Sequence, residues 1–423
     1  MGIGAVALTA VVATIYRDVT RTYYFNDDFQ WLQGARTFAV ANVLHIERYN
    51  HFYRPIIEIY FFIGRRLFGC DAPSFHIASV VVHLCNTALL YGFARALTKS
   101  AVFAGLTALL FAVQPGYVQA VVWVAAITDL LPATWYFLAL WMYLLYLEGR
   151  GRLFYTISLV AFAACLLTHE SSATLLAMMV ALEALTVVDG RRASVSVPLA
   201  TRATRYVPFA LLLASYLAIE YVVNSRSYLI TEGHYRLGWH AVTHGLDYLI
   251  TLSMGVHNLA FQALAVAGVV TLLVAGSARV RFFVVWILTT IVPSTFFVWE
   301  NSSRYLYLPA AGFAMLLAAG ILAFGQLMTS RLSPRAGRIA AGVLTIALAA
   351  RFAVSASHVP KEFRELTRPY RQFVSAVRRA DPAPLEGAVV YVDRENADGI
   401  PELYRDPAAE VASCGPDVHV VVR

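Results

Sequence analysis

Long apolar runs recur along the whole chain and constrain its fold more than any other feature. A helix needs about 20 apolar residues to cross a bilayer, and shorter runs suffice inside a bundle. Because 59% of the residues are hydrophobic and only 14% are charged, we expect an all-α polytopic membrane protein. The predicted spans, about eleven, are residues 2–16, 75–97, 100–115, 127–147, 153–168, 172–188, 206–223, 259–276, 282–299, 305–328 and 339–357.

Basic residues in the short loops predict the orientation of these spans. Loops that stay in the cytoplasm are enriched in Arg and Lys, and alternate loops of this chain carry such residues. Loop by loop, these residues are Arg95 and Lys99; Arg150 and Arg152; Arg191, Arg192, Arg202 and Arg205; Arg279 and Arg281; and Arg331, Arg335 and Arg338. We therefore expect a cytoplasmic N-terminus, with the long first loop (17–74) and a small C-terminal segment (358–423) outside. The net charge of +7 reflects this topology, so we expect no nucleic-acid partner.

The long external segments contain further predicted elements. Residues 53–66 and 246–259 mix apolar and charged side chains as interfacial amphipathic helices do. Residues 115–128 form a short connection between two spans. In the C-terminal segment, a basic helix over 362–379 precedes two apolar runs that could pair as strands, 387–392 and 418–422.

The four cysteines show no spacing typical of a metal site. Cys85 and Cys165 lie in apolar runs, whereas Cys70 and Cys414 lie on the same predicted side and could pair if that side is oxidising. The sequence therefore gives no support for a divalent metal cofactor, although it does not exclude one.

Two adjacent carboxylates follow directly on the first span. Asp27 and Asp28 have aromatic neighbours, and such surroundings together with mutual repulsion raise a carboxyl pKa toward that of a general base. The alternative is that the segment from Asn26 caps a helix that begins at Phe29. The two roles can coexist.

Other polar residues could bind a ligand at the same side. Arg54 suits a phosphate because guanidinium holds phosphate oxygens in pairs, but a snorkelling arginine would look the same. Arg304, with Tyr305 and Tyr307, could hold a head group or mark the interfacial aromatic belt.

Charged residues at membrane depth require a partner or a role. We expect Asp129, His169 and Glu170 to face a wet or protein-lined cavity. His76, His83 and Asn86 share one helical face and predict interhelical hydrogen bonds, with catalysis as the alternative.

Several segments, taken in order, resemble the GT-C class of membrane glycosyltransferases, most closely the transmembrane and tetratricopeptide-repeat-containing O-mannosyltransferases and their bacterial relatives. The segments are Phe25-Asn-Asp-Asp-Phe, Tyr53-Arg-Pro-Ile, Ser74-Phe-His-Ile, His83-Leu-Cys-Asn, Leu110-Phe-Ala-Val-Gln-Pro, Ala120-Val-Val-Trp, Thr128-Asp-Leu-Leu, Thr168-His-Glu and Arg304-Tyr-Leu-Tyr-Leu-Pro-Ala-Ala-Gly-Phe.

The resemblance implies an enzyme of the bacterial inner membrane with its active site on the external face. It would transfer a sugar directly, with inversion, from a polyprenyl-phosphate donor to an acceptor. Asp27 would be the base, and Asp28 its support or the second candidate. The residues expected to bind the donor phosphate or substrate are His51, Arg54, Gln114, Asp129, His169, Glu170, Arg304, Tyr305 and Tyr307.

The chain also departs from the family pattern. Gln114 stands where the family has His, Gln119 replaces a Glu, and His169 replaces a Lys, so that a positive charge at 169 depends on pH. The repeats are missing. These departures leave the sugar open between mannose and another hexose or pentose, and the acceptor open between a lipid-linked, glycan or protein group. A flippase for a lipid-linked intermediate and a noncatalytic membrane subunit remain alternatives.

Overall fold

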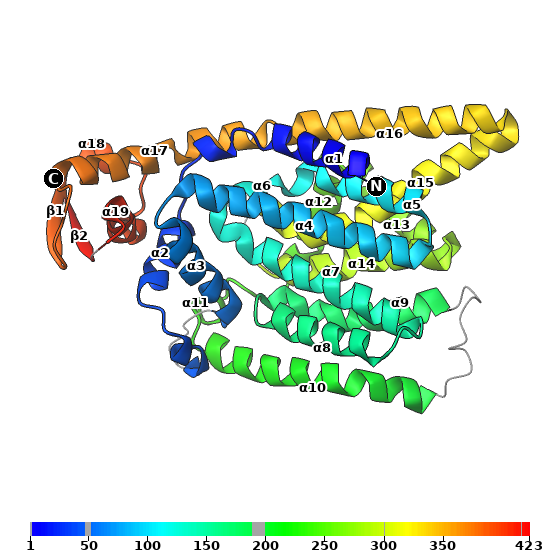
Figure 1. Cartoon of the computed structure of the whole chain (residues 1–423), viewed down its shortest axis with the longest axis horizontal. Coiled ribbons are helices and arrows are strands. Elements are labelled where there is room, and N and C mark those ends of the chain that lie inside the picture. The colour runs from blue at the N-terminus through cyan, green and yellow to red at the C-terminus, as the bar shows by residue number, and fades with distance from the viewer. Residues whose placement is uncertain (1, 47–51, 188–198, 300, 416) are drawn as a thin grey trace.

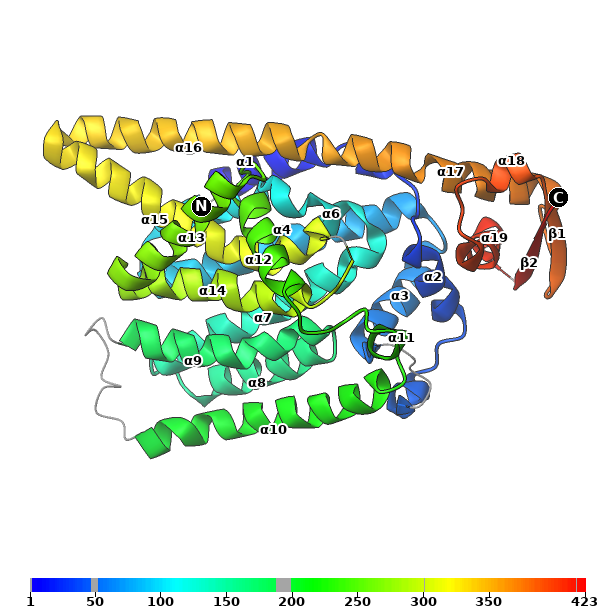
Figure 2. The same ribbon diagram turned by 180° about the vertical axis from the view of Figure 1, so that it is seen from behind.

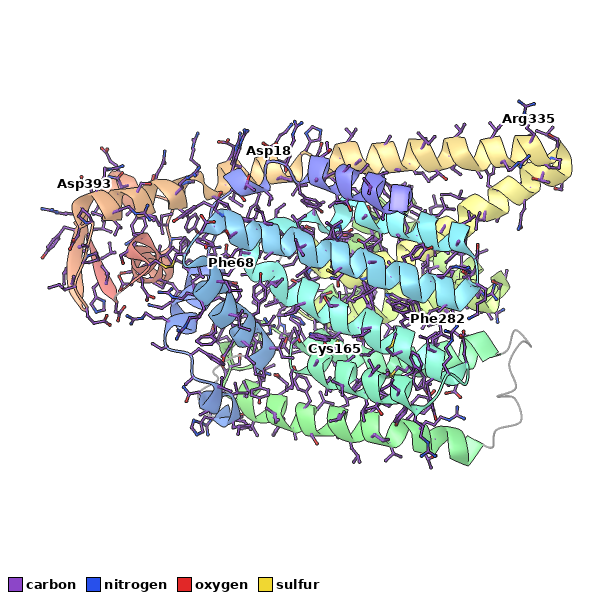
Figure 3. All side chains as sticks on the ribbon, viewed as in Figure 1. Asp18, Phe68, Cys165, Phe282, Arg335 and Asp393 are labelled. Carbon is purple, nitrogen blue, oxygen red and sulfur yellow. A yellow bond between two sulfur atoms is a disulfide. The ribbon has the colours of Figure 1, made fainter. Side chains whose placement is uncertain are left out.

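A computed structural model describes residues 2–46, 52–187, 199–299, 301–415 and 417–423. Helices lie side by side along the long axis of the molecule, with α10 at one edge and α16 at the other (Figure 1). Segments from the first loop and from the C-terminus gather at one end of this bundle, which we call the cap end. Figure 3 marks the two ends, with Asp393 at the cap end and Arg335 at the opposite end.

Each predicted span overlaps a helix of the bundle. These helices are α1 (Gly2–Ile15), α4 (Ala72–Thr98), α5 (Ala101–Ala112), α7 (Ile127–Leu147), α8 (Arg152–Leu166), α9 (Thr174–Val187), α10 (Leu199–Asn224), α13 (Leu259–Ala275), α14 (Ala278–Thr295), α15 (Tyr307–Arg331) and α16 (Pro334–Ala356). Among the described residues, six helices are long and apolar enough to cross a membrane, and a bent pair would make a seventh. The chain is an all-α polytopic membrane protein.

Polar side chains on α4 join this helix to its neighbours. His83 Nδ1 lies 2.8 Å from the Tyr307 hydroxyl on α15, and Asn86 Nδ2 donates to the Leu130 carbonyl on α7 at 2.9 Å. His76 Nε2 lies 2.9 Å from the Thr22 hydroxyl. Buried polar groups must find such partners where water is absent. The prediction of interhelical hydrogen bonds is confirmed.

The segment predicted as a connection over 115–128 is a buried, broken helix. The chain bends by 47° after α5 and continues through η4 (Pro115–Tyr117), α6 (Val118–Val122) and η5 (Val124–Ala126) into α7. Pro115 cannot continue the preceding helix because it lacks an N–H donor. The predicted connection between the two spans is present, but it is helical and buried, which the sequence analysis did not predict.

The described residues of the first loop form the helices η1 (Val19–Arg21), α2 (Asp27–Arg36), η2 (Val40–Leu44) and α3 (Pro55–Phe68). The amphipathic helix predicted over 53–66 corresponds to α3. The second predicted amphipathic segment begins earlier than expected: α11 (Tyr228–Thr231) and α12 (His240–Leu252) precede α13, and 253–258 is a turn.

The C-terminal residues 359–423 form a small cap. α17 (Val359–Ala380) follows end to end on α16, and β1 (Ala388–Val392), α18 (Arg394–Ala397), η9 (Glu402–Tyr404), α19 (Arg405–Ser413) and β2 (Val418–Val422) complete it (Figure 2). The two strands are parallel, with Ala388 opposite Val418 and Val392 opposite Val422. The predicted helix and strand pair are confirmed.

Covalent and ionic contacts hold the cap on the first loop. Cys70, which follows α3, forms a disulfide with Cys414 at the end of α19, so the pairing that the sequence left open is present. The fully buried Glu410 lies 3.4 Å from Arg65 Nη2 and 3.6 Å from Arg36 Nε. Burial raises the pKa of Glu410 to about 7, although both arginines lower it.

This carboxyl makes docking of the cap depend on pH. Its pKa rises from 4.5 in the free group to about 7, so its contribution is full below about pH 4.5 and is lost as pH rises through 7, by at most about 3 kcal/mol. We predict that hydrogen-exchange protection of α19, corrected for intrinsic rates, falls across this window. Glu410→Gln should remove that dependence, whereas the exposed Glu402→Gln should retain it; identical profiles for the two variants would contradict the assignment.

Candidate active site

One cavity at the cap end brings together most of the residues singled out from the sequence. Its volume is about 510 Å³. Its walls come from the start of α2, the residue before α3, η6 (Glu170–Ala173), the start of α7, the ends of α10 and α14, α11, and η8 (Ser303–Leu306). The predicted residues that line it are Asp27, Arg54, Asp129, His169, Glu170, Arg304, Tyr305 and Tyr307. His51 lies outside the described residues.

Asp27 is the carboxylate of the adjacent pair that faces this cavity. It is the first residue of α2, after a turn in which Asn26 has φ = 45°, a left-handed value that Asn tolerates better than most residues. The Asn26 side chain makes no capping hydrogen bond, so the predicted side-chain cap is absent. Asn26 Oδ1 instead accepts a hydrogen bond from the Tyr370 hydroxyl of the cap. Asp27 Oδ1 accepts one from the Tyr404 hydroxyl at 2.8 Å.

Asp28 is fully buried behind the cavity wall. Its Oδ2 accepts from the Phe25 amide at 2.8 Å and its Oδ1 from the Ala125 amide at 2.5 Å. Burial raises the pKa of Asp28 well above its usual value, against the opposing effect of these two amides. Both oxygens of Asp28 thus accept backbone hydrogen bonds, and Asp28 does not line the cavity, whereas Asp27 does.

A charged pair forms one side of the cavity. Arg54 Nη2 and Nε lie 2.6 and 2.9 Å from the two carboxylate oxygens of Glu170, a paired geometry that fixes the guanidinium plane. Burial opposes ionisation of Glu170, but Arg54 lowers its pKa below the ordinary value. Phe52 stacks under the guanidinium, 3.8 Å from Arg54 Cζ.

His169 adjoins this pair as a neutral group. Burial, with the positive charge of Arg54 next, lowers the pKa of His169 to about 3. Its Nδ1 accepts a hydrogen bond from the Ser171 amide at 3.1 Å. The positive charge beside Glu170 is therefore that of Arg54, and a cation at position 169 forms only at low pH.

Arg304 forms the second cationic centre. Its Cζ lies 4.5 Å above the Trp123 ring, and its Nη2 donates to the Tyr305 hydroxyl at 3.1 Å. Its Nε lies 3.7 Å from Asp129 Oδ2, which is too long for a hydrogen bond. Within the described part of the chain, neither of these two atoms has a hydrogen-bond partner. The pair can therefore receive a polar ligand without losing an existing hydrogen bond.

Two predicted residues have structural contacts. Gln114 does not line the cavity, and its Nε2 donates to the Leu252 carbonyl at 2.8 Å. Tyr307 lines the cavity, but its hydroxyl contacts His83 and Asn86 on α4. Gln119 Oε1 accepts from Ser302 and Ser303 at 2.9 and 3.1 Å, which fixes the turn before Arg304.

Sequence reasoning missed several lining residues. Glu220 on α10 lines the cavity, and its Oε1 accepts from the Tyr53 amide at 3.2 Å. A charge within a predicted span was the available signal for it. Tyr228, the first residue of α11, also lines the cavity, and no local pattern marks it. Tyr404 of the cap does not line the cavity but donates to Asp27 Oδ1, and no local pattern marks it either. Among the described residues, no group of three or more His, Cys, Asp or Glu side chains is arranged to hold a metal.

Comparison with known proteins identifies the architecture. No protein-family model and no curated protein matches the chain. A solved structure of ArnT from Cupriavidus metallidurans, a GT-C glycosyltransferase, superposes with a TM-score of 0.60 over 100% of this chain and 86% of that one, at 13% identity. The chain has the GT-C fold.

Two further structures share this GT-C fold. ArnT bound to undecaprenyl phosphate gives a TM-score of 0.58 at 13% identity and covers 99% of this chain and 85% of that one. The Archaeoglobus fulgidus oligosaccharyltransferase in complex with Zn and sulfate gives 0.55 at 13% identity, over 99% and 62% of the respective chains.

The two adjacent carboxylates should respond differently to the same substitution. Asp28→Asn puts an NH₂ group opposite a backbone N–H and should lower the free energy of unfolding by about 1–3 kcal/mol. Asp27→Asn keeps an oxygen for Tyr404 and should leave stability nearly unchanged. Thermal unfolding of both variants in detergent tests this, and equal losses would contradict the structural role of Asp28.

Proposed function

We propose that the chain is an integral-membrane glycosyltransferase that moves a sugar from a polyprenyl-phosphate donor to a hydroxyl acceptor, with Asp27 as the general base. The observation that carries this proposal is the single cavity that holds Asp27 together with Arg54 and Arg304. A transfer of this kind needs a base for the acceptor hydroxyl and cations for the departing phosphate. The GT-C fold and the undecaprenyl phosphate bound to ArnT support the choice of donor.

The proposed step is a direct displacement. Asp27 takes the proton of the acceptor hydroxyl while that oxygen forms a bond to the anomeric carbon. The bond between this carbon and the phosphate oxygen breaks, and the polyprenyl phosphate leaves with the electron pair. Arg54 and Arg304 stabilise the negative charge that grows on the leaving oxygen, because fixed cations in a water-poor site act more strongly than in water.

The Cys70–Cys414 disulfide supports an external location for the cap end. Disulfides persist in oxidising compartments such as the bacterial periplasm, and this one joins α3 to the cap beside the cavity. It agrees with the distribution of arginines in the loops. We therefore propose a plasma-membrane enzyme with a cytoplasmic N-terminus and a site that opens outside.

For the sugar and the acceptor, the proposal names only chemical classes. The donor sugar is mannose or another hexose or pentose, and the acceptor is a lipid-linked, glycan or protein hydroxyl. The lipid-linked sugar that co-purifies with the protein, identified by mass spectrometry, would define the donor. Substrate assays can then use that compound.

Asp27→Asn should abolish transfer because an amide cannot accept the acceptor proton. The expected fall in kcat is about 10²–10⁴-fold, measured with the identified donor, while thermal stability stays near that of the wild type. Full transfer by this variant would exclude the assigned role. Lipid flipping that survives loss of both Asp27 and Asp28 would favour the transporter alternative.

Arg304→Lys should weaken donor binding because a lysine cannot hold two phosphate oxygens in a plane or stack on Trp123 in the same way. We expect the donor KM to rise about tenfold, a loss typical of a charge-assisted hydrogen bond. The matched control is Arg66→Lys, an exposed arginine of α3 outside the cavity. An equal KM for Arg304→Lys and the wild type would remove Arg304 from the phosphate site.

A further inference from the structure

The hydrogen bond between the cap and Asp27 joins parts of the chain that are 377 residues apart. Tyr404 ends η9, the short turn before α19, and donates its hydroxyl to Asp27 Oδ1 at 2.8 Å. A base and the hydroxyl that it deprotonates lie about 2.6–3.2 Å apart. An acceptor must present a hydroxyl to this carboxylate at such a distance. The Tyr404 hydroxyl meets both conditions.

The direction from which Tyr404 approaches also fits an acceptor. In a displacement with inversion, the attacking oxygen and the leaving group lie on opposite faces of the sugar ring. Arg304 lies in η8, directly before the bundle helix α15, and Arg54, directly before α3, is paired with Glu170 of η6 between the bundle helices α8 and α9. Tyr404 comes from the cap. A sugar held between them would have its phosphate toward the arginines and its acceptor on the cap side.

The attachment of the cap determines what can move when an acceptor arrives. The far end of α19 is held by the Cys70–Cys414 disulfide and by Glu410 between Arg36 and Arg65. At the near end, Tyr404 is only partly buried, and its hydroxyl has one hydrogen-bond partner among the described residues, Asp27. A rotation of this side chain costs less than undocking α19, so the cap stays in place while the hydroxyl can leave.

We propose that Tyr404 marks the acceptor subsite, with its hydroxyl occupying the place on Asp27 that the acceptor hydroxyl takes. The cap is then a fixed wall of this subsite. Tyr228 on α11 lines the cavity, so it forms a second aromatic wall. The ligand class is an alcohol with one unhindered hydroxyl, which displaces Tyr404 from Asp27 Oδ1. This inference rests on the proposed glycosyltransferase function.

The first test needs no sugar transfer. A water-soluble carbodiimide with glycinamide labels accessible carboxyls, and peptide mass spectrometry gives the labelling rate of Asp27 in the purified full-length protein. Tyr404→Phe removes the hydroxyl and should raise this rate several-fold. The control Tyr391→Phe changes an exposed tyrosine of β1 and should leave the rate at the wild-type value. Glycerol at high concentration, as a small hydroxyl probe, should slow the labelling in Tyr404→Phe more than in the wild type.

The second test distinguishes two roles of Tyr404: a hydroxyl that the acceptor displaces from Asp27, or a group that positions Asp27. With the identified donor, Tyr404→Phe should lower the acceptor KM by about tenfold, the value of one hydrogen bond to a charged group, without lowering kcat. A fall in kcat at unchanged KM would show that Tyr404 positions Asp27 and would overturn the inference. So would an unchanged Asp27 labelling rate. Absence of transfer by the wild type, with the labelling difference intact, would instead count against the proposed function.

Discussion

The two backbone amides that hold the Asp28 carboxylate organise the whole cap end. One amide belongs to Phe25, just before α2, and the other to Ala125, within the broken helix between α5 and α7. A buried carboxylate without such partners would be costly, so these hydrogen bonds fix the start of α2 against the bundle. Asp27 is the preceding residue on the same helical turn, and its side chain consequently faces the cavity. The adjacent carboxylates thus have different surroundings. Asp28 is buried and accepts two backbone hydrogen bonds, whereas Asp27 lines the cavity.

The two arginines of the cavity, Arg54 and Arg304, also differ in their contacts. Arg54 Nε and Nη2 pair with the Glu170 carboxylate, which fixes the orientation of the guanidinium. Arg304 lies between Trp123, Tyr305 and Asp129, and its Nε lacks a hydrogen-bond partner among the described residues. Preorganised charge of this kind stabilises a developing anion without first having to reorganise. The neutral His169 beside them adds a polar group but no further charge.

The cap contacts the first loop and the bundle at the end where the cavity lies. α17 extends α16 beyond the bundle, and the chain then folds back so that α19 lies against α2 (Figure 1). The disulfide and the buried Glu410 fix one end of α19, and Tyr404 reaches Asp27 from the other. The contacts that dock the cap and the contact to Asp27 therefore lie on or directly beside one short helix.

The sequence by itself determined the spans, the amphipathic α3, the paired strands of the cap and the charged residues of the cavity except Glu220, because hydrophobic periodicity and isolated charges in apolar runs are local signals. It also identified Asp27 and Asp28 but could not separate them. Only the tertiary structure decided that Asp28 is buried, that Gln114 and the Tyr307 hydroxyl have structural contacts, that His169 is neutral beside Arg54, and that Tyr404 meets Asp27. Each of these depends on contacts between residues distant in the chain, and burial and charge at such contacts have no signature in the local sequence.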